Sequence, residues 1–291
     1  MAKKGELSPM MQQYFKVKKE YPGVILFFRL GDFYEMFFDD AKVASKELDL
    51  VLTGRDCGQE ERAPMCGVPF HSADSYIAKL VSRGYKVAIC EQMEDPAAAK
   101  GIVKRDVIRV ITPGTVIESN ILEDGTNNYL CSICKGANET GICFADVSTG
   151  EFHITVVGRE DEQEKIINQL STYSPKEIIT NSAASGLDKV EKFADNRFSV
   201  SFEKVDDSKF DFDYATNLIL ETMKRDEISS LNLGHSKAAV CALGAVIDYL
   251  RETQKRDDIE APSEIEYYDG SDFMALDVSA RRNLELTRSM M

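Results

Sequence analysis

The chain has 291 residues, of which 43% are hydrophobic and 29% are charged, and these proportions are those of a globular protein with its own core. Its length exceeds one typical domain, so we expect two domains. No uninterrupted apolar run approaches the roughly 20 residues that a membrane span needs, and no apolar segment follows the first two lysines. We therefore expect a cytoplasmic protein with no membrane partner.

The net charge of −14 is unevenly distributed along the chain. Residues 1–120 hold 17 basic and 17 acidic side chains, whereas the remaining residues hold 18 basic and 32 acidic ones. A strongly acidic surface repels phosphate groups. The first part of the chain is therefore the better candidate for lying against phosphates, and the second part is expected to avoid them.

Seven cysteines form an odd set in a chain for which no secretory signal is expected, and this favours reduced thiols over disulfides. Cys131 and Cys134 form a C-x-x-C pair, but no second pair stands at the spacing of a zinc site. Both lie in a strand-like run. We expect them to be buried or half-buried thiols, and we expect no metal site.

The first 117 residues alternate helices with strands. Ser8 and Pro9 are typical of a helix start, with serine at the N-cap and proline at the first helical position, and Tyr21-Pro22-Gly23 ends this helix. Further helices are expected at 39–48 and from His71 to Ser82, and strands at 24–29, 65–68, 85–90 and 107–111. Thr53–Arg62 is expected to be a mobile surface loop. Such alternation predicts a mixed sheet covered by helices.

Residues 118–128 are polar and rich in turn formers, and a domain boundary is expected there. Three successive strands joined by tight turns then predict an antiparallel meander. The expected strands are 128–135, 141–147, 151–157, 177–180, 198–202, 264–269 and 273–276. The expected helices are 161–173, 213–223, 237–254 and one that begins at Ser279.

A short aromatic stretch carries the main candidate site. It follows an apolar strand, and Gly31-Asp32 reads as a turn before it. If the stretch is extended, Phe33 and Glu35 point to one side while Tyr34 and Met36 point to the other. An aromatic ring beside a carboxylate would make a wedge with a hydrogen-bonding group next to it. The alternative is that Phe33 belongs to the core and Glu35 is a solvated strand residue.

Several short motifs in fixed order resemble one family. They are Gly31-Asp32-Phe33-Tyr34-Glu35, Gly67-Val68-Pro69-Phe70-His71, Ala88-Ile89-Cys90-Glu91-Gln92, Thr112-Pro113-Gly114-Thr115, Asp146-Val147-Ser148-Thr149-Gly150 and Arg281-Arg282-Asn283-Leu284-Glu285. Together they resemble the MutS family of bacterial DNA mismatch repair proteins, and the first is similar to that family's mismatch-binding motif.

The resemblance implies an α/β (mixed α+β) fold of two domains. A mixed sheet flanked by helices would be followed by an RNase H-like connector and then a truncated helical lever segment. The implied parts are a mismatch-binding domain at 1–117, a linker at 118–127, the connector at 128–262 and the start of the lever at 263–291.

The resemblance also implies that Phe33 inserts into mismatched double-stranded DNA from the minor groove while Glu35 hydrogen-bonds the mispaired base. A set of basic residues is expected to contact the DNA backbone: Arg29, Arg55, His71, Lys100, Lys104, Arg105 and Arg109. Each of them has an alternative as a solvated surface charge, and His71 as a neighbour of a helix N-cap. Backbone contacts would position the wedge without reading sequence.

The longer proteins of the family bind ATP and Mg²⁺ and form homodimers, and their connector offers a surface to MutL. The phosphate-binding loop needs a Gly-Lys step, and no glycine in this sequence precedes a lysine, so we expect no cofactor and no ATPase activity in this chain. One alternative function is a partner-recruiting, MutL-binding module with little DNA affinity. Another is a metal-dependent nuclease that uses Asp146, which is more readily explained as a turn residue.

Overall fold

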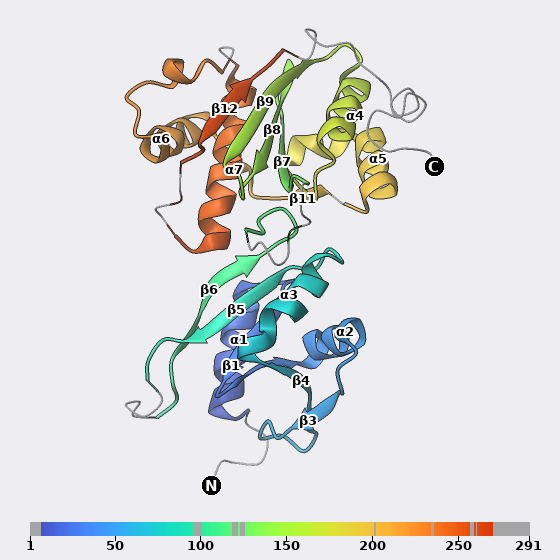
Figure 1. The fold of residues 1–291 in the computed structure, drawn as a ribbon, viewed down its shortest axis with the longest axis vertical. Coiled ribbons are helices and arrows are strands. Elements are labelled where there is room, and N and C mark those ends of the chain that lie inside the picture. Colours follow the sequence, from blue (N-terminus) through green and yellow to red (C-terminus); the bar gives the residue numbers. More distant parts are fainter. Residues whose placement is uncertain are drawn as a thin grey trace. The chain divides into compact units, whose positions relative to one another are not determined.

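The computed structural model describes residues 7–95, 101–117, 122, 126–200, 202–233, 236–256, 259 and 261–269. They form two compact units, one built on the residues up to Pro113 and one that begins at Gly114 (Figure 1). Each unit has its own six-stranded sheet and its own core. Within the described residues, no helix is long and apolar enough to cross a membrane.

The sheet of the first unit has the strand order β3-β4-β2-β1-β5-β6. Only β1 and β5 run parallel, and every other neighbouring pair is antiparallel, so the mixed sheet expected from the sequence is confirmed. The strands are β1 (Ile25–Leu30), β2 (Phe33–Phe37), β3 (Thr53–Arg55), β4 (Ala63–Pro69), β5 (Val87–Gln92) and β6 (Arg105–Ile111).

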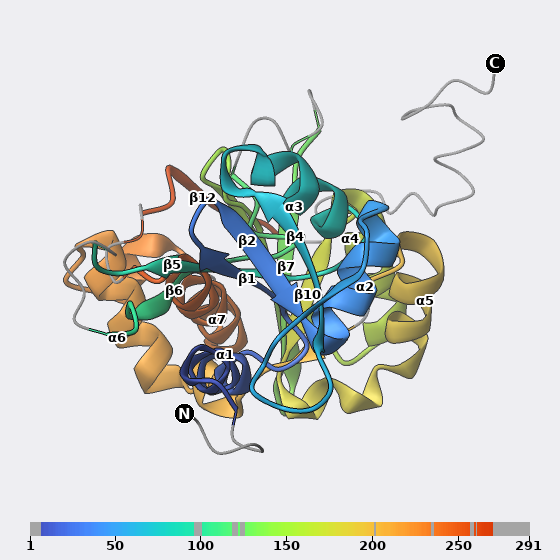
Figure 2. The ribbon, with the colours of Figure 1, turned by 90° about the horizontal axis from the view of Figure 1, so that it is seen from below.

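Three α-helices cover this sheet: α1 (Pro9–Glu20), α2 (Phe38–Leu48) and α3 (Ala73–Val81), the last preceded by the 3-10 turn η1 (Phe70–Ser72). Figure 2 shows α1 on one side of the strands and α2 with α3 on the other. The expected start of α1 is confirmed, because the Ser8 hydroxyl accepts a hydrogen bond from the Met11 amide at 3.4 Å.

Aromatic side chains hold α1 against the sheet. The Tyr14 ring meets Phe28 edge-on at a centroid distance of 5.5 Å and Phe37 at 5.1 Å. All three rings are buried. Burying one such side chain is worth about 1.5–3 kcal/mol, so this small cluster contributes strongly to holding the helix on its face of the sheet.

The second unit contains a sheet of order β11-β10-β7-β8-β9-β12. β7, β8 and β9 form the expected antiparallel meander, and β10, β11 and β12 are added in parallel to their neighbours. The bounds are β7 (Tyr129–Lys135), β8 (Glu139–Asp146), β9 (Glu151–Gly158), β10 (Glu177–Thr180), β11 (Phe202–Lys204) and β12 (Glu264–Tyr267).

Helices cover both faces of this second sheet, with α6 and α7 on one side and α4 and α5 on the other (Figure 1). Their bounds are α4 (Glu162–Tyr173), α5 (Asp188–Phe198), α6 (Phe212–Met223) and α7 (Lys237–Gln254), with short 3-10 turns η2 (Ser182–Gly186), η3 (Asp207–Phe210) and η4 (Ile228–Leu231). Two separate apolar clusters result, one on each face. The mixed α/β fold class predicted from the sequence is confirmed.

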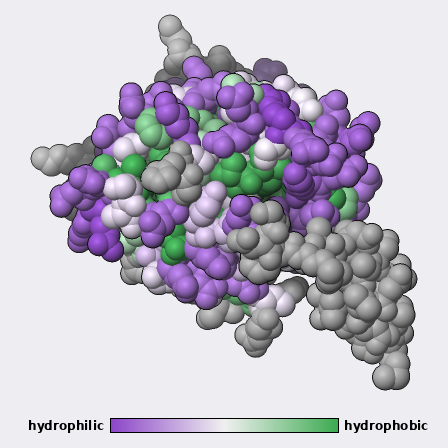
Figure 3. All heavy atoms as spheres, turned by 90° about the horizontal axis from the view of Figure 1, so that it is seen from above, coloured by the Kyte–Doolittle hydropathy of each residue, from purple (hydrophilic) through white to green (hydrophobic). Residues whose placement is uncertain are grey.

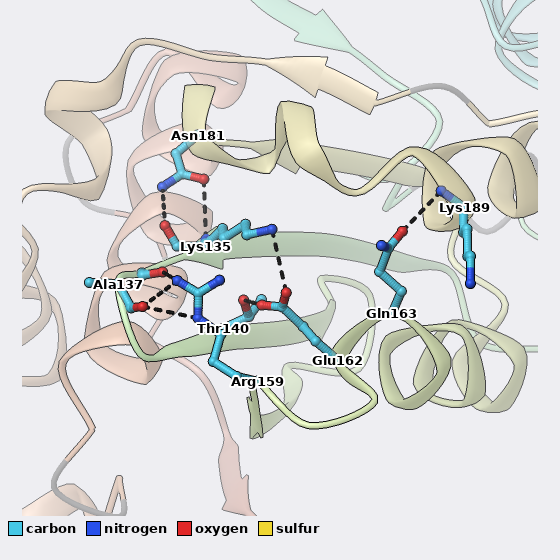
Figure 4. Close-up of polar contacts among 9 residues, drawn as sticks. Lys135, Ala137, Thr140, Arg159, Glu162, Gln163, Asn181 and Lys189 are labelled. Atoms are coloured by element: carbon cyan, nitrogen blue, oxygen red, sulfur yellow. Dashed lines mark hydrogen bonds and ion pairs between the residues drawn. The ribbon is translucent and has the colours of Figure 1, made fainter.

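A polar network ties α4 to the strands at the β7–β8 hairpin (Figure 4). The nearly buried Glu162 carboxylate accepts a hydrogen bond from the Thr140 hydroxyl at 2.6 Å and lies 3.4 Å from the Lys135 ammonium. The Asn181 amide group donates to the Lys135 carbonyl and accepts from its N–H. Because the buried charges are paired and hydrogen-bonded, this network is structural.

Two secondary-structure predictions are wrong in part. Thr53–Arg55, expected in a loop, forms the edge strand β3, which pairing with β4 stabilises despite its short length. The strand expected at 198–202 instead begins at Phe202, and Phe198 ends the unpredicted helix α5. That helix is highly charged and buries only Val190 and Ala194, so its apolar periodicity is weak.

Several predictions fall outside the described residues. They are most of the linker 118–127, the lever segment from residue 270 onward, the strand at 273–276 and the helix from Ser279. The bounds given for the four parts of the chain therefore stay a prediction.

Gly141 provides a test of the packing of α7 on the sheet. A Cβ at this position would lie 2.1 Å from the Ala238 carbonyl oxygen, which is backbone that cannot swing aside. We expect Gly141→Ala to lower the free energy of unfolding by about 3 kcal/mol, measured by chemical denaturation. Gly158→Ala is the control, because a Cβ there meets nothing within 4 Å. Equal stability of the two variants would contradict the close packing.

Candidate nucleic-acid interface

The candidate wedge lies at the start of β2, directly after a two-residue turn. Leu30 pairs with Phe33 across the β1–β2 hairpin, so Gly31 and Asp32 alone make the turn. Gly31 has a φ of 58°, which favours glycine, and a positive φ at the first loop position is the requirement of a tight II′ hairpin turn. The turn fixes the register and therefore which side chains of β2 share a face.

Burial falls steadily along one face of β2. Phe37 is fully buried beneath α1, the Glu35 side chain is 13% exposed, and Phe33 is 46% exposed. Alternation along a strand places these three on the same face. The extended conformation and the shared face predicted for Phe33 and Glu35 are what the strand shows. The ring therefore projects at the end of the face that α1 leaves uncovered.

Two arginines lie on the same face, and they differ in exposure and in hydrogen-bond partners. Arg55 of β3 forms an ion pair with Glu35, and 37% of its side chain is exposed. Arg105 is buried, and its guanidinium lies 5.2 Å from the centre of the Phe28 ring. It donates to the carbonyls of Arg29 and Val103 at 2.7 and 2.9 Å. These bonds hold the Arg105 guanidinium inside the unit, so it is a poorer candidate for a phosphate contact than its charge predicts.

The opposite face of the hairpin is braced by a second polar group. The buried Tyr34 hydroxyl donates to the Glu91 carboxylate, and this burial raises the pKa of Tyr34 above its ordinary value. The Arg29 guanidinium lies 3.3 Å from Glu91 and donates to the Gly31 carbonyl at 2.6 Å. It also stacks 3.6 Å from the centre of the Phe70 ring. Arg29 therefore braces the hairpin turn.

Phe70 is a residue that sequence reasoning missed as a separate feature. Its amide donates to the Asp32 carbonyl at 2.9 Å, and its ring is partly exposed. The preceding Pro69 pairs with Phe33. Phe70 is part of the Gly67–His71 motif in the sequence. Nothing in the local pattern, however, predicted that it contacts the turn between β1 and β2.

The other basic candidates are scattered. Lys104 is exposed just before β6, and its backbone amide donates to the Glu94 carboxylate at 2.7 Å. His71 is exposed beside the Phe70 ring in η1, and it directly precedes Ser72, the N-cap residue of α3, so the alternative of an N-cap neighbour is confirmed. Arg109 is half-buried in β6. Lys100 lies outside the described residues.

Comparison with protein families decides the relationship. Residues 8–120 match the family model described as MutS domain I, and residues 128–263 match the one described as MutS domain II. The chain belongs to the MutS family. The first unit, with the hairpin and its exposed ring, thus lies within MutS domain I, and the meander with its helices lies within MutS domain II.

Close relatives carry the same family name. Proteins named DNA mismatch repair protein MutS from Acetivibrio thermocellus, Ruminiclostridium cellulolyticum and Alkaliphilus oremlandii are 49%, 46% and 46% identical to this chain. Each alignment covers 98% of the chain but 32% of the relative. The chain thus spans about a third of the length of these MutS proteins.

Asp146, the acid considered for a nuclease, has its carboxylate occupied in the turn of MutS domain II. It accepts hydrogen bonds from the Ser148 backbone N–H and hydroxyl at 2.9 and 2.6 Å and from the Asn128 backbone N–H at 3.0 Å. Such bonds are those of an aspartate that shapes a turn. Among the described residues, no group of three or more His, Cys, Asp or Glu side chains is placed to hold a metal ion.

The seven cysteines of this MutS chain are all free and buried, as expected for the C-x-x-C pair. Burial raises the pKa of the Cys90 thiol to about 12 and that of the Cys66 thiol to about 11. Thiols of such high pKa are poor nucleophiles at neutral pH. Cys66 and Cys90 therefore serve as small apolar core residues.

The contrast between Arg105 and Lys104 can be tested by stability. Arg105→Gln would leave the Arg29 carbonyl without its buried donor, so we expect a loss of about 2 kcal/mol in the free energy of unfolding. Lys104→Gln removes an exposed charge and should change it by less than about 0.5 kcal/mol. Urea denaturation of both variants makes the measurement. If the Arg105→Gln protein is as stable as the unmodified one, the hydrogen bonds of Arg105 are not needed for the fold, and Arg105 becomes a candidate phosphate contact again.

Proposed function

We propose that the first unit recognises mispaired or kinked duplex DNA by inserting Phe33 into the base stack from the minor groove. The observation that carries the proposal is the 46% exposure of Phe33 on a strand face whose inner part, at Phe37, is covered by α1. An apolar ring left open at the end of a rigid hairpin is costly to hydrate and is shaped to enter another apolar stack.

The physical basis of recognition is the deformability of the duplex. Inserting an apolar side chain between base steps costs a few kcal/mol for each unstacked step. A mispaired step is already weakly stacked and kinks more readily, so less of that cost remains. The wedge therefore selects a loosened step rather than a sequence of bases.

Glu35 supports this proposal from the same face of β2. In the proposed complex its carboxyl group hydrogen-bonds the mispaired base. On an intact duplex a carboxylate beside phosphates is unfavourable, so Glu35 also weakens binding to matched DNA. Arg55 and Lys104, which are at least partly exposed, are the proposed backbone contacts, together with His71 and Arg109.

The activities of the longer MutS proteins extend the proposal. We propose that ATP and Mg²⁺ binding and homodimerisation depend on parts of those proteins beyond the matched third. MutL would meet the connector, the second unit. One face of the molecule, shown in Figure 3, is mostly hydrophilic with a few small apolar patches.

The central test compares matched duplex DNA with a duplex carrying one mismatch. We expect Phe33→Ala to weaken binding of the mismatched duplex about tenfold or more, because stacking of one base on an aromatic ring is worth about 1–3 kcal/mol. Binding of the matched duplex should change little. Fluorescence anisotropy titrations at one fixed salt concentration give both affinities.

Phe15→Ala is the matched control, because Phe15 is an aromatic residue of similar exposure, 40%, placed on α1. It should leave the preference for the mismatch intact. Equal weak binding of both duplexes, unaffected by Phe33→Ala, would refute the wedge and favour the partner-recruiting, MutL-binding module.

A further inference from the structure

The Glu35 carboxylate, which the proposed function directs at a base, already has a partner in the free protein. It forms an ion pair with the Arg55 guanidinium. Only 13% of the Glu35 side chain is exposed, against 37% of the Arg55 side chain. Arginine is therefore the accessible member of the pair, and the carboxylate is the shielded one.

The sheet makes this pair possible through a glycine. β4 lies between β2 and β3, and Gly67 stands opposite Glu35. A Cβ at position 67 would lie 3.4 Å from Glu35 Cγ and 3.2 Å from the Tyr34 carbonyl oxygen, which is tighter than ordinary contact. Glycine thus leaves room beside β4 for the Glu35 side chain, whose partner is two strands away.

We propose that Arg55 is a positioning residue that holds Glu35 in an ion pair in the free protein and moves to a DNA phosphate when Glu35 takes a mispaired base. The inference rests on the proposed function and adds a step to it. Arg55 would contact the backbone only where a mismatch gives Glu35 another partner.

The chemistry of the two partners supports the exchange. Guanidinium groups bind carboxylates and phosphates with the same two-pronged geometry, so a phosphate can replace Glu35 directly. A partly exposed ion pair is weak and can be given up. On matched DNA no free base group receives the carboxylate, and releasing Arg55 would leave Glu35 unpaired against a polyanion. Arg55 therefore stays on Glu35 when the duplex is matched.

The salt dependence of binding tests the exchange, because each phosphate contact adds about 0.9 to the slope of log K against log salt concentration. We expect Arg55→Gln to reduce this slope by about 0.9 on a mismatched duplex and to leave it unchanged on a matched one. A residue with a merely structural role would change neither slope.

Glu35→Gln releases Arg55 without changing the size of side chain 35. In that background we expect Arg55→Gln to reduce the slope by about 0.9 on both duplexes. Lys104→Gln is the comparison, because an exposed lysine that contacts a phosphate should have the same effect on both duplexes in either background.

The ion pair itself is measured without DNA, by NMR of the Arg55 guanidinium protons. Their exchange with water should become severalfold faster in Glu35→Gln. An unchanged exchange rate would overturn the pair, and the exchange of partners with it, whatever the DNA affinity. A faster rate in a chain that binds neither duplex would leave the pair standing while both the proposed function and the transfer fall.

The remaining outcomes are equally decisive. Equal reductions of the slope by Arg55→Gln on both duplexes, with Glu35 present, would make Arg55 an ordinary phosphate contact. No reduction on the mismatched duplex, although that duplex binds preferentially, would show that Arg55 never reaches a phosphate. Either result overturns the exchange.

Discussion

The packing of α1 against the sheet determines what the rest of the first unit can do. Tyr14 covers Phe28 and Phe37 edge-on, and this contact seals the inner part of the face. The same face continues along β2 past the end of the cover, where Glu35 is mostly shielded and Phe33 is open. One strand therefore joins a rigid core to an exposed apolar ring. Rigidity matters for the proposed function, because a ring that bends away could not force a base step open.

The basic residues around the hairpin show that equal charges can have unequal availability. Arg105 is held by carbonyl groups inside the unit, Arg29 braces the turn and stacks on Phe70, and Arg55 is shared with Glu35. Lys104, by contrast, is exposed. An arginine is well suited to such internal roles because its planar group donates several hydrogen bonds at once. The number of basic side chains is therefore larger than the number whose charge is available to a ligand.

Elements with a strong local signal could be predicted from the sequence. The Ser8-Pro9 motif predicted the first residue of α1, and the helix expected at 237–254 has the bounds of α7. β3 and α5 were missed because one depends on pairing with β4 and the other buries only two small apolar side chains. The Arg55–Glu35 pair was also beyond reach, since it depends on β4 lying between β2 and β3. The order of strands in a sheet depends on the tertiary fold and cannot be read from one segment. The alternation of side chains along β2 is a local property, so it could be predicted.

The two-residue turn before Phe33 has a consequence for how this protein can vary. Under the proposed function, another bulky apolar side chain at position 33 would also fill a gap between bases. Length does not tolerate change: inserting or deleting a single residue at Gly31-Asp32 shifts the pairing of β2 by one place and turns every side chain to the opposite face. The Phe33 ring would then lie on the face where Tyr34 packs now, and Tyr34 would stand in its place. Substitutions in this hairpin are therefore expected to be tolerated more readily than insertions or deletions.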